Sequence, residues 1–350
     1  MKKSLLALAV LGAFAGAASA QSSVTIYGIV DTSIAHVDQG HESVNSLYSG
    51  GDAASRIGFK GIEDLGNGLK AEFLLENGLD TSDGETNKAG YAFGRLAYVG
   101  LDGAFGKVRL GRQDTQLKEL FGQIDPFGAA GGANVMDLIL NGDLAQRNAN
   151  EITWISNNYS GFSASASYEF GEVEGDNSAN RGYGIRVGYA NGPLNVQVAY
   201  ENQNYTDPTV PVDADDKSAV IGATYDFGSF KLHGMYGERR LGANTDTYAD
   251  PTNVDDKIRS GLIGVTVPFG ANAIRAEYIR NDNRDVDNAD NSVWVLSYQY
   301  FLSKRTHLYA TYAHVSNDDN SQLGLGSGDF AADDFGQNVN GVLLGIQHKF

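Results

Sequence analysis

From residue 24 to the end, apolar and polar residues alternate in short runs that are separated by turn residues. The run 162–170 reads F-S-A-S-A-S-Y-E-F, and 194–201 reads L-N-V-Q-V-A-Y-E. Alternation with a period of two predicts strands with one apolar and one polar face. Asn67-Gly68, between two such runs, is a strong hairpin signal. The predicted strands are 24–35, 55–63, 69–76, 91–101, 107–112, 151–157, 162–170, 182–190, 194–202, 218–227, 230–239, 258–269, 273–281, 292–302, 306–315 and 340–350.

The connections between these sixteen runs alternate in length. Short turns, such as 103–106, alternate with long polar segments, such as 203–217. An outer-membrane barrel has this layout, with short periplasmic turns and long external loops, whereas a β-sandwich has no reason for it. The last run keeps its phase up to Phe350, as required if it pairs with the first run and leaves no open edge. The pattern predicts an all-β fold, a 16-stranded antiparallel transmembrane β-barrel.

One long interval breaks the rhythm. Between 113 and 151 the alternation stops, and the chain contains Asp125-Pro126-Phe127-Gly128 and a small apolar cluster at 135–140. A connection of this length inside a compact domain is usually functional. We interpret residues 114–150 as the third long loop, folded into the lumen so that it narrows the bore.

The N-terminus predicts the compartment. Lys2 and Lys3 precede an apolar run at 5–17, and Ala18-Ser19-Ala20 has the form of a signal-peptidase site. This combination is typical of a cleaved secretory signal, and the apolar run is too short to span a bilayer as a helix. We expect residues 1–20 to be removed and residues 21–350 to form a single barrel domain, which reaches the outer membrane through the periplasm.

Composition narrows the classes of function. Without Lys2 and Lys3, 24 basic residues face 43 acidic ones, and the resulting net charge of −19 argues against binding nucleic acid. The chain has no cysteine, and a barrel needs no disulfides because it closes its own ladder of hydrogen bonds. Its 18 tyrosines and 16 phenylalanines can supply the aromatic girdles at the two membrane interfaces.

Other kinds of site find little support in the sequence. The histidines are not at metal-ligand spacing, and the acidic segment 282–290 lacks the glycine and late glutamate of an EF-hand. The glycines at 66–68 do not open a helix after a buried strand, as a dinucleotide site requires. No G-x-S-x-G element supports a hydrolase. We therefore expect no metal, no cofactor and no enzymatic activity.

Several motifs resemble one known family. S-R-I-G-F-K-G (55–61), G-R-L-A-Y-V-G-L (94–101), L-G-R-Q (110–113), D-P-F-G (125–128) and the terminal I-Q-H-K-F are similar to the general diffusion porins of Gram-negative bacteria. The betaproteobacterial and neisserial type is the most similar, over essentially the whole mature chain. The resemblance implies a homotrimer in the outer membrane, in contact with lipid and lipopolysaccharide. It also implies a passive, water-filled channel for ions and small hydrophilic solutes, and Phe350 after Lys349 as the signal to the barrel-assembly machinery.

The resemblance also implies a pore constriction made of basic and acidic residues. An arginine that faces lipid near the midplane costs ~2–4 kcal/mol, so strand arginines should face the lumen or a subunit contact. The expected basic wall is Arg56, Arg95 and Arg147, with Lys60 in the lumen phase of Arg56. The expected carboxylates are Glu72 and Glu76 on their strand and Asp125, Asp137 and Asp143 on the inward loop. Arg112 is in phase with Val108 and Leu110, which places it outside, where it could meet a neighbouring subunit's segment 80–90.

Selectivity follows from the charges at the narrowest section, because remote charges are screened beyond ~8 Å at physiological salt. The arginines favour a mild preference for anions, whereas Asp31, Glu72, Glu76 and the acidic loops oppose it. A substrate-specific porin is an alternative, and it would show saturable block by one class of solute. A barrel that acts mainly as an adhesin or an enzyme is a further alternative, and it would give no large open-channel conductance.

Overall fold

The computed structural model describes residues 23–132, 134–142, 144–206, 213–242, 255–326 and 330–350, so the predicted signal peptide and Asp143 lie outside the described residues. The strands are β1 (Ser23–Asp38), β2 (Ser43–Ser49), β3 (Arg56–Gly66), β4 (Leu69–Gly78), β5 (Leu96–Gly103), β6 (Gly106–Asp114), β7 (Arg147–Ile155), β8 (Phe162–Glu169), β9 (Gly182–Asn191), β10 (Leu194–Thr206), β11 (Asp213–Asp226), β12 (Lys231–Gly242), β13 (Asp255–Phe269), β14 (Asn272–Asn283), β15 (Asn291–Phe301), β16 (Thr306–Asn317) and β17 (Val339–Lys349). The helices are α2 (Gln116–Ile124) and two short 3-10 helices, η1 (Val135–Asp137) and η2 (Ile139–Asn141). None of the described helices is both long and apolar enough to cross a membrane.

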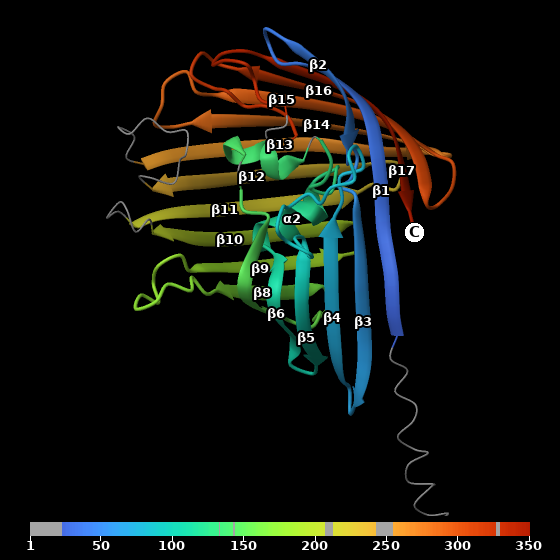
Figure 1. Ribbon diagram of the computed structural model, residues 1–350, viewed down its shortest axis with the longest axis vertical. Helices are drawn as coiled ribbons and strands as arrows, with labels where there is room; N and C mark the ends of the chain where they lie inside the picture. Colours follow the sequence, from blue (N-terminus) through green and yellow to red (C-terminus); the bar gives the residue numbers. More distant parts are fainter. Residues whose placement is uncertain (1–22, 133, 143, 207–212, 243–254, 327–329) are drawn as a thin grey trace, which may run out of the picture.

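The strands form one closed antiparallel barrel. Each strand from β3 to β17 pairs with the next, and β17 returns to β1 in the register Ile29 to Lys349 and Asp38 to Asn340 (Figure 1). On its other edge β1 pairs with β3 along residues 23–29 and with β2 along residues 32–38. Since β2 and β3 together complete one strand of the barrel, seventeen segments make sixteen barrel strands. The predicted fold is confirmed.

Several predicted boundaries differ from those of the structure; for example, β7 begins at Arg147 rather than 151 and β11 at Asp213 rather than 218. The expected strand 91–101 begins only at Leu96, because the residues before it form turns in which the Tyr91 N–H donates to the Lys88 carbonyl at 3.3 Å. The connection between the predicted strands 24–35 and 55–63 was expected to be a loop, but it contains β2, which pairs with β1 as a hairpin.

The two faces of the strands differ as a barrel in a bilayer requires. In β14 the side chains of Arg275, Glu277 and Asn281 are buried on one face, whereas Ile274 on the other is exposed. Ile34 and Ile263 are each 64% exposed on the outer surface. An apolar outside and a polar inside are the pattern of membrane barrels, in which lipid covers the outer face.

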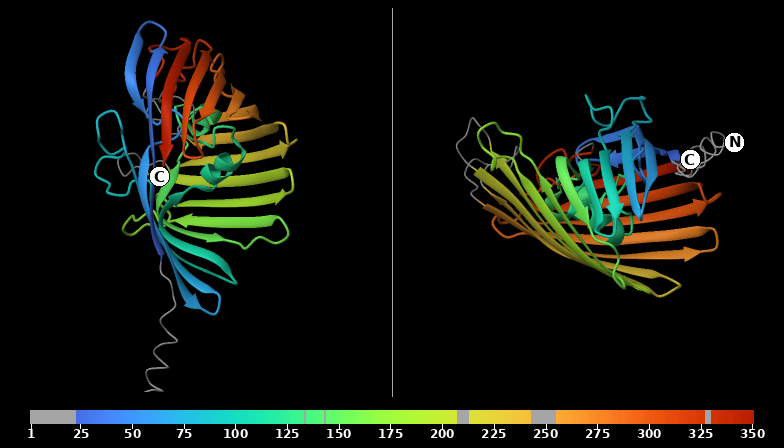
Figure 2. Two further views of the ribbon diagram at one scale, coloured as in Figure 1. Left: turned by 90° about the vertical axis from the view of Figure 1, so that its right-hand side faces the viewer. Right: turned by 90° about the horizontal axis from the view of Figure 1, so that it is seen from below.

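The segment between β6 and β7 contains a helix that the sequence reading did not predict. Leu117, Leu120, Phe121 and Ile124 are buried and recur at the spacing of one helix face. The side chain of Thr115 caps the helix by accepting a hydrogen bond from the Lys118 N–H at 3.1 Å. Figures 1 and 2 show α2 on the concave side of the strands.

Hydrogen bonds attach this segment to buried side chains of the barrel wall. The Gln116 N–H donates to the Glu201 carboxylate of β10 at 2.5 Å. Further along, the Leu140 N–H donates to Ser260 Oγ at 2.9 Å and to Asn281 Oδ1 at 3.0 Å. The contacts with β10, β13 and β14 mean that the segment is held by several strands at once.

Candidate functional site

A cavity of about 860 Å³ lies between the β6–β7 segment and the wall formed by β3 to β6. Its lining is strongly charged. The basic side chains in the lining are Arg56, Lys88, Arg95, Arg112, Lys118 and Arg147, and the acidic ones are Glu76, Asp80, Asp114 and Glu119. Within the described part of the chain, cations therefore outnumber carboxylates at this cavity by six to four.

The three predicted wall arginines all line this cavity. Arg56 begins β3, Arg147 begins β7, and Arg95 directly precedes β5, so each lies at the same end of its strand. Glu76 of β4 joins two of them, because its carboxylate accepts from Arg95 Nε at 2.6 Å and lies 3.8 Å from Arg56 Nε. This geometry gives a basic wall that one carboxylate partly neutralises.

Two further contacts fix the positions of these charges. The Tyr27 hydroxyl of β1 donates to the Glu76 carboxylate at 2.7 Å. Arg147 Nε lies 2.9 Å from Asp114 Oδ1, at the start of the β6–β7 segment. The hydrogen bond from Tyr27 orients the Glu76 carboxylate, whereas Arg147 and Asp114 attract each other as an ion pair without a hydrogen bond between these two atoms. The wall is therefore held in place before any solute arrives.

On the loop side the lining is mostly neutral apart from Lys118 and Glu119. It consists largely of small and amide residues, such as Gly122, Gln123, Ala129 and Gln146. The Lys118 ammonium of α2 donates to the Ala129 carbonyl and to Gln146 Oε1 at 3.4 Å. Burial and the nearby guanidinium of Arg147 lower the pKa of Lys118 to about 8. Lys118 thus adds a titratable positive charge opposite the arginines.

The predicted loop carboxylates do not line this cavity. Asp125 is buried behind the loop, where it accepts a hydrogen bond from the Ala129 N–H at 2.8 Å, and burial raises its pKa. Asp125 follows the last residue of α2, and its carboxyl group lies beside Arg275 and Glu277 of β14. Asp137 accepts a hydrogen bond from Gln146 Nε2 at 3.2 Å. Asp125 and Asp137 are thus not among the lining residues of this cavity, although Asp137 contacts the lining residue Gln146.

Lys60 and Glu72 lie outside the cavity lining. The Lys60 ammonium lies 5.1 Å from the centre of the Tyr27 ring. Glu72 is four residues before Glu76 on the same face of β4, and accepts a hydrogen bond from Arg109 Nε at 2.7 Å. Both residues are closer to the short Asn67-Gly68 turn than Arg56 and Glu76 are.

Arg112 belongs to the lining of the cavity. The pairing of β6 with β7 shifts register between Gly111 and Gln113, and Gly111 has a φ of 132°. The extra residue of this β-bulge is in β7, and the pairing of β6 with β5 continues without a shift to Arg112, which is opposite Ala97. The Arg112 side chain nevertheless reaches the lining, where its Nε donates to the Gly94 carbonyl at 2.7 Å. Arg112 thus shares the phase of Val108 and Leu110, as expected, while its guanidinium group contributes to the cavity. Its predicted contact with a neighbouring subunit stays a prediction.

Lys88 and Lys118 are lining residues that the sequence reading missed. Lys118 lies on the polar face of an amphipathic helix, and recognising that helix would have drawn attention to it. Lys88 lies in a turn region between β4 and β5, and its ammonium is 4.3 Å from the centre of the Tyr91 ring. Nothing in the alternation of the sequence predicts where Lys88 points.

The C-terminal residue completes the barrel. The Phe350 N–H donates to the Gly28 carbonyl and the Gly28 N–H donates to the Phe350 carbonyl, both at 3.1 Å. These paired bonds continue the β1–β17 ladder to the end of the chain.

A closed barrel with an apolar outside and a charged interior is the architecture of an outer-membrane channel. The chain belongs to the Gram-negative porins, whose family model matches residues 7–320. It is 36% identical to outer membrane porin protein 32 of Delftia acidovorans, over 100% of both chains. It is 32% identical to an outer membrane porin protein of Bordetella pertussis, over 91% of this chain and 95% of the relative.

A solved structure agrees with this assignment. An anion-selective porin from Comamonas acidovorans superposes with a TM-score of 0.83 at 33% identity, and the match covers 94% of this chain and 100% of that chain. OmpT of Vibrio cholerae, at 15% identity and a TM-score of 0.70, shares the fold. The protein is an outer-membrane porin channel, and the family and fold are those of channel proteins.

Proposed function

We propose that the protein is a passive, water-filled diffusion channel that prefers small anions. The observation that carries the proposal is the surplus of cations in the 860 Å³ cavity, six against four carboxylates among its described lining residues. Fixed charges at a narrow section determine which ions enter, whereas charges beyond ~8 Å are screened. The overall negative charge of the chain therefore does not decide its selectivity.

The loop between β6 and β7 sets the size limit in this proposal. Its helix α2 and its 3-10 helix η2 are hydrogen-bonded to side chains of the wall, and its lining residues are mostly small. Such a surface limits solute size without recognising one solute. Of the described lining residues only Tyr27 and Tyr48 are aromatic, which favours general diffusion over a solute-specific aromatic path.

The Comamonas acidovorans relative is described as anion-selective, and we propose the same preference for this chain. On the loop side Lys118 and Glu119 have opposite charges and Asp125 is withdrawn from the lining, so the surplus of cations comes from the wall. Glu76 and Asp114 moderate the field, since each accepts a contact from a wall arginine. The expected behaviour is a moderate rather than an absolute rejection of cations.

The test is the reversal potential of the refolded protein in a planar bilayer under a potassium chloride gradient. Arg56→Ser with Arg95→Ser leaves equal numbers of cations and carboxylates at the cavity, so we expect a shift toward cation preference. The control is Arg280→Ser with Arg284→Ser, which removes the same charge from exposed residues paired with Asp290 and Asp282. If the first pair leaves the potential unchanged, the arginines do not determine selectivity.

We also propose that three copies assemble in the outer membrane and contact lipopolysaccharide. One structure of Vibrio cholerae OmpT is described as a trimer form, and the resemblance extends that arrangement to this chain. Chemical cross-linking of outer membranes followed by denaturing gel electrophoresis tests the assembly. A band pattern that stops at the monomer contradicts the trimer.

A further inference from the structure

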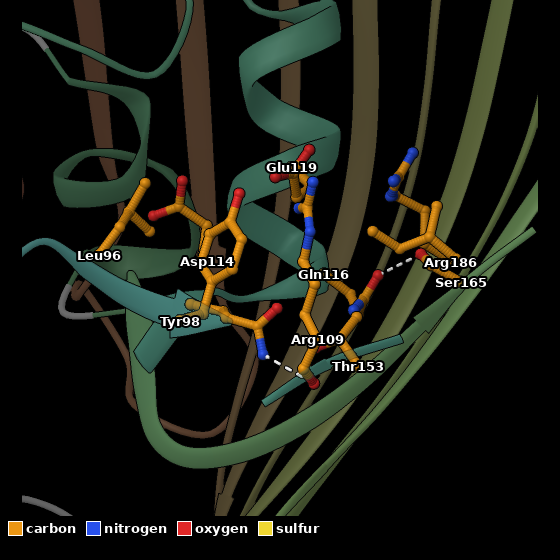
Figure 3. Close-up of a pocket in the computed structure, with 11 residues that line it drawn as sticks. Leu96, Tyr98, Arg109, Asp114, Gln116, Glu119, Thr153, Ser165 and Arg186 are labelled. Atoms are coloured by element: carbon orange, nitrogen blue, oxygen red, sulfur yellow. Dashed lines mark hydrogen bonds between the residues drawn. The ribbon is translucent and has the colours of Figure 1, made fainter. Parts of the chain in front are cut away.

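A second, smaller cavity adjoins the first beneath helix α2. Its volume is about 120 Å³, and its lining includes Arg109 of β6, Arg186 of β9 and Glu119 of α2 (Figure 3). Leu96, Asp114 and Glu119 belong to the lining of both cavities. The two spaces therefore meet at a boundary that carries two carboxylates.

Arg186 is unusual because no carboxylate holds it. Its Nη1 donates to Gln197 Oε1 at 3.1 Å, and its Nε is buried with no hydrogen-bond partner in the part of the chain that the structure describes. None of the described carboxylates lies within salt-bridge distance of Arg186, although Glu119 is close enough to influence it electrostatically. A buried cationic N–H normally has a partner, so this guanidinium is suited to an exchangeable one.

Arg109 is positioned on the same cavity by two contacts. Its Nε donates to the Glu72 carboxylate at 2.7 Å, and its guanidinium carbon lies 4.6 Å from the centre of the Tyr98 ring. The carboxylate and the aromatic ring hold the guanidinium in one orientation, which lowers the entropy lost when it binds an anion. Figure 3 shows Arg109 and Arg186 on the same side of α2 as Glu119.

Hydrogen-bonding side chains surround the two guanidinium groups. Gln116 accepts a hydrogen bond from the Ser165 hydroxyl, and Gln113 and Thr153 also belong to the lining. The space is large enough for a few waters or one small oxyanion. Planar guanidinium groups match the oxygen geometry of carboxylate and phosphate.

We propose that Arg109 and Arg186 form a second binding station for a small oxyanion, a carboxylate or a phosphate group, which an anion reaches after the large cavity. The station lies toward the short turns, because Arg109 follows the turn at 103–106 and Arg186 precedes the turn between β9 and β10. Glu119 at the boundary limits occupancy by charge repulsion. The inference rests on the proposed passage of anions, and it adds a site outside the arginine wall.

Inorganic phosphate is the probe for this station. In single-channel recordings in potassium chloride, we expect added phosphate to reduce the chloride current in a saturable way. Arg186→Gln removes a charged donor and should weaken the apparent affinity for phosphate about tenfold, the effect of one charge-assisted hydrogen bond. Arg186→Lys should restore part of that affinity, and Glu119→Gln should raise it above that of the wild type.

The matched control is Arg284→Gln, which removes the same charge from an exposed residue and should leave phosphate block unchanged. Gel mobility before and after heating reports whether each variant forms the barrel. If folded Arg186→Gln is blocked by phosphate as strongly as the wild type, the station does not exist. The reversal potential in potassium chloride, measured on the same channels, tests the proposed anion preference separately, because Arg56, Arg95 and Arg147 remain in place.

Discussion

Replacing Asn281 by alanine removes a side chain that fastens the β6–β7 segment to the barrel wall. The residue lies on β14 with no exposed surface. Its Oδ1 accepts from the Leu140 N–H at 3.0 Å, and its Nδ2 donates to the Leu138 carbonyl at 2.7 Å. The same side chain also contacts Ser260 and Asn291, which connects the loop to β13 and β15.

Asn281→Ala removes two hydrogen bonds to the loop that differ in their contribution to stability. The Leu140 N–H keeps its second acceptor, Ser260 Oγ at 2.9 Å, so that loss is small. The buried Leu138 carbonyl loses its hydrogen-bond donor from Asn281. One lost hydrogen bond costs about 1 kcal/mol and an unsatisfied buried group adds roughly 1–3 kcal/mol. The free energy of detaching the loop should therefore fall by about 2–4 kcal/mol, which raises the detached population roughly 30- to 700-fold.

Hydrogen–deuterium exchange of the detergent-solubilised protein measures this change. We expect faster exchange of the amides at 135–142 in Asn281→Ala, together with greater noise in the single-channel current, because the loop borders the large cavity. The control is Asn272→Ala on the same strand, whose side chain contacts Tyr298 and Phe269 at the other end of β14. Unchanged exchange at 135–142 in a folded Asn281→Ala barrel would refute the reasoning.

Three other outcomes are expected. As the pH rises through about 8, Lys118 loses its proton, so the anion preference of the wild type should decline between pH 7 and 9. Reversal potentials measure this change, and the preference should stay nearly constant in Lys118→Met. Deleting Phe350 removes the two backbone hydrogen bonds to Gly28, so the amount of heat-modifiable barrel in outer membranes should fall. The same amount as in the wild type would exclude a role for the terminal residue in assembly. Gly111→Ala places a Cβ against the Ala97 carbonyl oxygen at a residue whose φ is 132°. The resulting strain of about 1–3 kcal/mol should lower the midpoint of the unfolding transition. An unchanged midpoint would show that the backbone at the bulge relaxes freely.

The alternation of side chains was enough to predict the barrel. Lipid on one side and water on the other impose opposite polarity on successive residues, so the run at 162–170 reveals its strand without knowledge of its neighbours. The in-phase run to Phe350 likewise predicted closure, which the paired bonds to Gly28 confirm. Arg56, Arg95 and Arg147, which the resemblance to a family indicated, lie in the lining of one cavity, and their role in a pore constriction stays a prediction.

Where the alternation is interrupted, only the tertiary structure determines which side chains meet. Arg112 keeps the phase of Val108 and Leu110 along β6, yet its side chain reaches the Gly94 carbonyl and the cavity, a contact that no local pattern predicts. The segment between β6 and β7 shows most clearly what the local sequence cannot predict. Leu140 meets Ser260 and Asn281, which lie 120 and 141 residues further along the chain, and Asp125 is withdrawn to β14. Local sequence sets the face of a strand residue, but the charges that share one cavity depend on contacts between distant segments that exist only after the barrel has closed.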